Sequence, residues 1–189
     1  MQDLLNSQNQ PSKQKLAVFF RVLGQISYWI HLILGATSAI ILGLILFSRK
    51  LGEPPNNSAI KISLIITVGS LIALGFRIFW AWRYSRMAKK LQIADPALQP
   101  KRAEIVGILR VGLYSSLLGL ILAFLASETT VVTIIAEAIA QPQGSRLYEP
   151  QQAIETADLF LDFVNVTILG AHSLGTINSL GLLNWITRE

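Results

Sequence analysis

Four long apolar stretches alternate with polar segments along the chain. They cover residues 26–48, 62–82, 105–126 and 158–186. About 20 apolar residues are enough for a helix to cross a bilayer, so each stretch can span a membrane once. The pattern predicts an all-α, polytopic membrane protein in which four transmembrane helices form a single bundle over residues 15–189, with short amphipathic helices beside it.

The segments outside these spans have their own patterns. Residues 1–14 are rich in Gln and Asn, which predicts a disordered tail. Residues 16–23 carry apolar side chains at helical spacing, so they form either a short amphipathic helix on the membrane surface or a plain helical run-in to the first span. The stretch ETTVVTIIAEAIAQ, residues 128–141, is too short and too acidic for a fifth span. We expect it to form a separate interfacial or re-entrant helix.

The last apolar stretch contains a regular series of polar residues. They are separated by three, four or seven positions, so on an α-helix they form one stripe. An unpaired polar group at membrane depth costs several kcal/mol, so this stripe cannot face lipid. It must face other helices or water. The stripe consists of Asp158, Asp162, Asn165, His172, Thr176 and Ser179.

Small residues recur along one face of the first span and one face of the third. Such faces allow helix backbones to approach closely inside a membrane. A Gly-rich apolar segment can also show this spacing by chance. The predicted helix-packing positions are Gly35, Ala39 and Gly43 in the first span, and Gly112 and Gly119 in the third.

Charge is scarce and unevenly distributed. Only 14% of the residues are charged, against about 25% in soluble domains. Basic residues gather in the loop between the second and third spans, whereas most of the charged residues within 128–158 are acidic. The positive-inside rule therefore places the basic loop and both termini in the cytoplasm. We expect the basic residues to contact lipid headgroups rather than nucleic acid. They are Arg83, Arg86, Lys89, Lys90, Lys101 and Arg102.

Ionisable residues inside a span are candidate functional sites because burying them is costly. His172 lies near the middle of the last span, where an imidazole can bind a transition metal, relay a proton or make one structural hydrogen bond. Asp162 lies nearer the acidic end, where carboxylates either attract cations or stabilise the start of the helix. His172 and Asp162 are thus the candidate metal ligands. The residues of the candidate cation path are Asp158, Asp162, Asn165, His172 and Thr176.

Two other ionisable residues lie inside spans. We expect His31 to be a hydrogen-bonded packing residue more readily than a ligand. We expect Arg77 to extend toward the cytoplasmic headgroups, about 7.5 Å away along the helix. The chain has no cysteine, so it has no disulfide and no thiolate metal site. Catalytic motifs are absent, and we expect neither an enzyme nor a resident cofactor.

Three runs give the chain a family resemblance: FRIFWAWRYSRMAKKL, SETTVVTIIAEAIAQPQG and LGAHSLGTINSL. With the four spans, they make it similar to the Permease-In-Chloroplasts family of the chloroplast inner envelope, also described as a small subunit of the inner-envelope protein translocon (Tic). The resemblance covers about residues 16–186 and implies two competing roles, iron permeation and protein import. It carries over no site residues. A start without a transit-peptide pattern fits a cyanobacterial member rather than a nuclear-encoded plant one. The expected location is a cyanobacterial plasma or thylakoid membrane, or else a plastid inner envelope.

Two functions of different classes follow. The first is permeation of a metal cation, such as ferrous iron, along a path lined by the last span. A single four-span chain offers little room for a pore, so this function requires a homo-oligomer. The second is a non-transporting subunit or assembly partner of a larger membrane complex, which binds other membrane subunits through its helix-packing faces.

Overall fold

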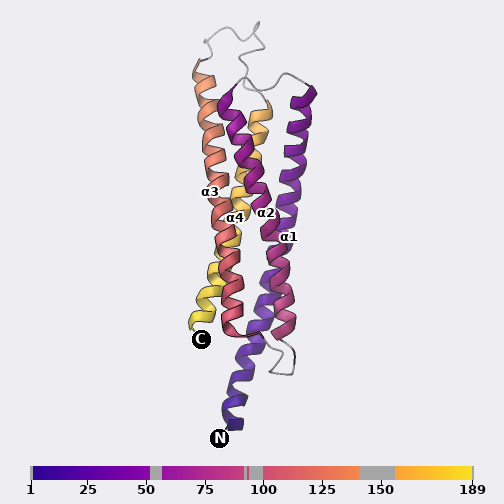
Figure 1. Cartoon of the computed structure of the whole chain (residues 1–189), viewed down its shortest axis with the longest axis vertical. Coiled ribbons are helices and arrows are strands. Elements are labelled where there is room, and N and C mark those ends of the chain that lie inside the picture. Colours follow the sequence, from indigo (N-terminus) through magenta and orange to yellow (C-terminus); the bar gives the residue numbers. More distant parts are fainter. Residues whose placement is uncertain (1, 52–56, 92, 94–99, 141–155, 189) are drawn as a thin grey trace.

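The computed structural model describes residues 2–51, 57–91, 93, 100–140 and 156–188. Four long helices form an elongated bundle in which each helix runs antiparallel to the next (Figure 1). The beginning of α1 and the end of α4 lie at the same end of the bundle (Figure 1). The helices are α1 (Gln2–Leu51), α2 (Ser58–Leu91), α3 (Arg102–Ala140) and α4 (Thr156–Arg188).

Each helix contains a stretch that is long and apolar enough to cross a membrane. These stretches are Val18–Arg49, Ser58–Lys90, Arg102–Ala140 and Thr156–Thr187. The prediction of an all-α bundle of four spans is therefore confirmed.

The first helix is longer than the first predicted span. α1 begins at Gln2 and so includes residues 2–14, where the sequence predicted a disordered tail. It continues through residues 16–23 into the span, which is the run-in alternative rather than a separate surface helix.

The prediction of a separate helix at residues 128–141 is wrong. α3 continues without a break to Ala140, because neither Gly nor Pro interrupts this part of the chain. The hydroxyls of Thr130 and Thr133 donate to carbonyl oxygens one turn earlier in the same helix, at 2.9 and 2.8 Å. Both side chains are buried, so this part of α3 packs inside the bundle instead of lying on the membrane surface.

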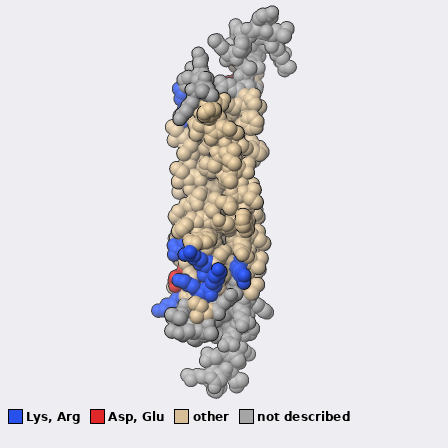
Figure 2. Space-filling view, turned by 90° about the vertical axis from the view of Figure 1, so that its right-hand side faces the viewer, with Lys and Arg blue, Asp and Glu red and all other residues tan. Residues whose placement is uncertain are grey.

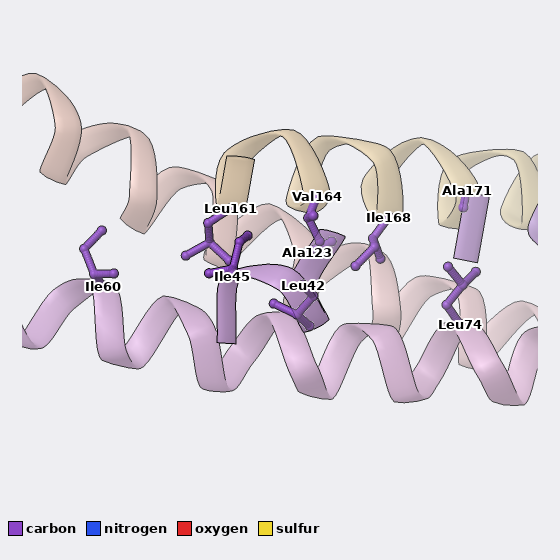
Figure 3. Close-up of a cluster of buried hydrophobic side chains, with 9 residues drawn as sticks. All are labelled: Leu42, Ile45, Ile60, Leu74, Ala123, Leu161, Val164, Ile168 and Ala171. Atoms are coloured by element: carbon purple, nitrogen blue, oxygen red, sulfur yellow. The ribbon is translucent and has the colours of Figure 1, made fainter. Parts of the chain in front are cut away.

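The interior contains two apolar clusters at different depths. The first lies toward the end that holds the chain termini and includes Phe20, Tyr84, Leu109 and Leu182. The second lies toward the other end, and Figure 3 shows how side chains of all four helices meet in it. Its members are Leu42, Ile45, Ile60, Leu74, Ala123, Leu161, Val164, Ile168 and Ala171.

The outer surface is apolar along most of its length and basic near one end. Large apolar side chains such as Ile65 and Ile40 are 71% and 64% exposed, as expected for a surface that faces lipid. Lys and Arg side chains gather near the end that holds the termini (Figure 2). The six basic residues predicted to contact lipid headgroups are all exposed: Arg83, Arg86, Lys89, Lys90, Lys101 and Arg102.

Candidate functional site

The polar stripe of α4 faces the other three helices. Asn165, His172 and Ser179 have no exposed surface, and Asp158 is 4% exposed. Asp162 and Thr176 are half-buried. The stripe therefore belongs to the interior of the bundle, which is the environment that the cost of unpaired polar groups in lipid requires.

The two carboxylates at the start of α4 bind neighbouring helices. Asp158 forms an ion pair with Arg49 of α1. Asp162 accepts a hydrogen bond of 2.7 Å from the hydroxyl of Ser127 on α3. The predicted acidic mouth is thus not a pair of free carboxylates, because the charge of Asp158 is compensated within the bundle.

Asn165 connects three helices through its side-chain amide. Its oxygen accepts a hydrogen bond of 2.6 Å from the hydroxyl of Thr67 on α2. Its nitrogen lies 3.5 Å from the hydroxyl oxygen of Thr130 on α3, which in turn lies 2.6 Å from the hydroxyl of Ser63. The sequence analysis missed Ser63, Thr67 and Thr130. Their signal was present in α2 as hydroxyl residues at positions 63, 67 and 70, spaced as one face of a helix.

His172 is fully buried and packs against a glycine. Its Nε2 lies 3.2 Å from the carbonyl oxygen of Ser70 on α2, so Nε2 carries the proton and donates it. A methyl group on Gly119 of α3 would lie 2.1 Å from two atoms of the imidazole ring. The ring can therefore occupy this position only because residue 119 has no side chain.

Arg77 points into the bundle, so the expectation that it extends to the headgroups is wrong. Its side chain has no exposed surface. One terminal nitrogen, Nη2, donates to the carbonyl oxygen of Gly175 at 3.1 Å and to the hydroxyl of Ser179 at 3.2 Å. The guanidinium carbon lies 5.2 Å from the centre of the Tyr84 ring. These inward contacts hold the Arg77 side chain inside the bundle. Its position on α2 is about 20 Å along the helix from Lys90, which belongs to the basic end of the bundle.

His31 is also buried and bonded within its own helix. Its side chain is 1% exposed, and its Nδ1 contacts the carbonyl oxygen of Ser27 one turn earlier. The same nitrogen lies 3.3 Å from the hydroxyl oxygen of Ser27. The structure thus places His31 in the interior as a hydrogen-bonded side chain.

The predicted helix-packing positions fall into two groups. A methyl group on Gly112 would lie 1.9 Å from the Tyr84 hydroxyl, and one on Gly35 would lie 3.2 Å from Ile78, so both glycines lie at helix contacts, as Gly119 does. Ala39 and Gly43 are exposed, and a methyl group on Gly43 would meet nothing within 4 Å. The stripe in α1 is therefore not one continuous contact face, because the buried positions recur at 35, 38, 42 and 45 and the four-residue steps carry Ala39 and Gly43 out of that face.

The structure does not bring the predicted metal ligands together. Asp162 and His172 are separated by ten positions on one helix, or about 15 Å. No group of three or more His, Cys, Asp or Glu side chains that could hold a metal ion occurs among the described residues. A single site formed by both residues would need ligands within about 2–2.6 Å of one ion, which this separation excludes.

The fold and its polar interior define an integral membrane protein with four spans. Residues 10–187 match the family model described as "Protein of unknown function (DUF3611)", and the chain belongs to this family. It is 32% identical, over 182 residues, to "Protein TIC 21, chloroplastic" of Arabidopsis thaliana. That match covers 92% of this chain and 58% of the relative's length. The resemblance to the inner-envelope translocon family is thereby confirmed, and no solved structure matches the chain.

Proposed function

We propose that this protein is a non-transporting subunit of a larger membrane complex and that it binds a helix of another membrane protein in a groove between α1 and α4. The groove, with a volume of about 490 Å³, carries this proposal. It is lined by Phe19, Leu23, Ile177, Asn178, Gly181 and Trp185.

Asn178 is the reason to expect a protein in this groove. Both polar atoms of its side-chain amide lack a hydrogen-bond partner, although neither is exposed to solvent. Lipid tails cannot satisfy an amide. A polar side chain of another transmembrane helix can accept and donate in return once the Asn178 side chain turns into the groove that it lines. Gly181 adds an open position, because a methyl group there would meet nothing within 4 Å.

The charge of the interior argues against the other candidate, permeation of a metal cation through the chain. Arg77 places a permanent positive charge between the four helices. His31 and His172 are close enough to the Arg77 guanidinium to interact with its charge. A fixed guanidinium at the middle of a path repels cations. Four of the five stripe side chains that were candidates for a cation path, Asp158, Asp162, Asn165 and His172, are bonded to neighbouring helices instead. The fifth, Thr176, donates to the carbonyl oxygen of His172 in its own helix.

The family resemblance is compatible with this choice, because one of its two implied roles, protein import, requires contacts with other membrane subunits; its other implied role is iron permeation. We further propose that the chain is not an enzyme and that its basic end, with both termini, lies in the cytoplasm. The location that we propose is a cyanobacterial plasma or thylakoid membrane, or else a plastid inner envelope.

A photo-crosslinking amino acid placed at Ile177 tests the docking proposal in the native membrane. We expect a crosslink to one defined membrane polypeptide, and we expect Asn178→Leu to abolish it. The matched control is the same crosslinker at Ile65, which is exposed on α2. Equal yields at the two positions, or crosslinks only to lipid, would contradict the proposal.

Purified protein in liposomes tests the alternative. An inert protein fits the subunit proposal. Flux of Fe²⁺ or Mn²⁺ that depends on Asp162 and His172 would instead establish cation permeation. It would contradict the proposal that the protein is a non-transporting subunit.

A further inference from the structure

The outer face of α2 changes from apolar to basic within one helical turn. The large exposed apolar side chains of this helix run from Ile62 to Trp82. Arg83, Arg86 and Lys90 follow, and all three are exposed. Positions 83, 86 and 90 recur at i, i+3 and i+7, so these side chains share one face of the helix. Since tryptophan marks the membrane–water interface, this basic face lies at the depth of the lipid headgroups.

Two guanidinium groups of the basic face are held on indole rings. The guanidinium carbon of Arg83 lies 4.5 Å from the centre of the Trp80 ring, and that of Arg86 lies 3.5 Å from the centre of the Trp82 ring. A stacked guanidinium keeps the N–H donors at its edge available for an acceptor. The stacking also orders both side chains before a ligand arrives, which lowers the entropic cost of binding.

Trp80 is itself fixed to the neighbouring helix. Its indole N–H donates to the carbonyl oxygen of Ile108 on α3, at 2.7 Å. Phe76, one turn earlier on α2, stacks on the same indole, with the ring centres 5.1 Å apart. Phe76, Trp80 and Arg83 therefore form a continuous row from the apolar surface to the basic face, and the fold sets the position of the Arg83 guanidinium.

The positive charge of the basic face is not neutralised within the part of the chain that the structure describes. α2 contains neither Asp nor Glu. No carboxylate of the described residues forms an ion pair with Arg83, Arg86 or Lys90. Like charges one turn apart on a helix repel each other. A bound anion removes this repulsion and accepts charge-assisted hydrogen bonds from the guanidinium groups.

Other basic residues near this end of the bundle are arranged differently. Arg102 uses its Nη2 to donate to the carbonyl oxygen of Ile186, near the end of α4. Lys101 precedes α3 and so lies on a different element from the basic face. A general attraction to anionic lipid involves all these charges alike, whereas the ordered arrangement on indole rings belongs to α2.

We propose that Arg83, Arg86 and Lys90 form a specific site for one anionic phospholipid of the phosphatidylglycerol type. The two guanidinium groups bind its phosphate, Lys90 adds a third positive charge, and the acyl chains lie along the apolar surface that ends at Trp82. The ligand is a membrane lipid rather than free phosphate, because the basic face continues directly into the lipid-facing surface of the same helix. This site goes beyond the headgroup contacts expected of all six basic residues and does not rest on the proposed assembly role.

Trp80 and Trp82 lie in the proposed site and can report on its occupancy. Trp29→Phe and Trp185→Phe remove the other two tryptophans of the full chain, which is then placed in phosphatidylcholine vesicles. Lipids brominated near the glycerol end of their acyl chains quench indoles that they contact. We expect half-maximal quenching at a mole fraction about tenfold lower for brominated phosphatidylglycerol than for brominated phosphatidylcholine. Equal quenching by the two lipids, or displacement of the brominated phosphatidylglycerol by inorganic phosphate, would overturn the proposal.

Variants with matched charge separate a specific site from a general attraction to anionic lipid. Arg83→Gln and Lys101→Gln each remove one positive charge, and both positions are exposed, so both variants should fold. We expect Arg83→Gln to weaken the preference for phosphatidylglycerol by about fivefold and Lys101→Gln by less than about twofold. Arg83→Lys keeps the charge but loses the planar, stacked donors, so it should also weaken the preference. Equal losses in Arg83→Gln and Lys101→Gln, or an Arg83→Lys variant that binds like the parent, would overturn the proposal.

Discussion

The guanidinium of Arg49, near the end of α1, forms an ion pair with the carboxylate of Asp158, at the beginning of α4. The side chains are only 9% and 6% exposed, so the pair is largely shielded from solvent. It joins the first and last helices at the end of the bundle opposite the chain termini. A residue that the sequence offered as the entrance of a cation path is thus a structural link between helices.

Removing one partner of this pair should destabilise the bundle strongly. Arg49→Met removes the Arg49 charge from beside the buried Asp158 carboxylate, and the loss of one member of a buried pair costs about 3–5 kcal/mol. The double variant Arg49→Met with Asp158→Leu should recover most of that loss, because no charge remains buried. Thermal or denaturant unfolding in detergent measures both. A double variant as unstable as the single one would show that the pair is not the source of the effect.

Gly119 should tolerate no side chain, because His172 fills the space beside it. Gly119→Ala places a methyl group 2.1 Å from the imidazole, and the resulting overpacking should cost about 1–3 kcal/mol. Gly43→Ala is the matched control, since its methyl group meets nothing within 4 Å. Melting temperatures of the two variants provide the comparison. Equal values would mean that α3 and α4 are farther apart than described here.

Asn165 should contribute to stability through its two bonds to neighbouring helices. Asn165→Leu removes the acceptor of Thr67 and the donor to Thr130, and we expect a loss of about 1–3 kcal/mol. Thr167→Val is a suitable control on the same helix, because the Thr167 hydroxyl bonds only to the carbonyl oxygen of Phe163 in its own helix, at 2.8 Å. A loss in the control as large as in Asn165→Leu would assign the effect to α4 itself and not to the contacts between helices.

Labelling from the two sides of the membrane should confirm the orientation. The chain contains no cysteine, so single cysteines at Lys89 and Ile139 can be labelled selectively. Both positions are exposed, and they lie near opposite ends of the bundle. We expect an impermeant maleimide to reach Lys89→Cys only from the cytoplasmic side and Ile139→Cys only from the other side. Labelling of both from one side would exclude the proposed topology.

The comparison of Arg77 with His172 illustrates the limits of sequence analysis. Helical spacing alone placed His172 on an inward stripe near mid-depth, and the structure places it there. Spacing could not decide whether Arg77 extends outward to headgroups or inward to α4, because a flexible side chain can do either from the same backbone position. That choice depends on Ser179 and the Gly175 carbonyl, which are about 100 residues away in the chain.

Two other expectations from the sequence also differ from the structure, because they too depend on how the helices pack against each other. Gly35 meets α2 but Gly43 does not, because the buried positions of α1 recur at 35, 38, 42 and 45, and a step of four residues rotates Gly43 out of that face. The continuation of α3 beyond residue 128 was missed because its acidic residues suggested a surface. Glu137 instead accepts a hydrogen bond of 2.9 Å from Asn57, which precedes α2.

The sequence by itself determined that the chain crosses a membrane four times and that the polar face of the last span must be sheltered. Both conclusions follow from the local cost of placing polar groups in lipid, which depends only on which residues lie one helical turn apart. Only the tertiary structure decided which side chains provide the shelter. The convergence of His31, Arg77 and Ser116 on Gly175 requires residues from four helices to meet at one depth. No local pattern encodes that meeting, because it is set by the packing of whole helices against each other.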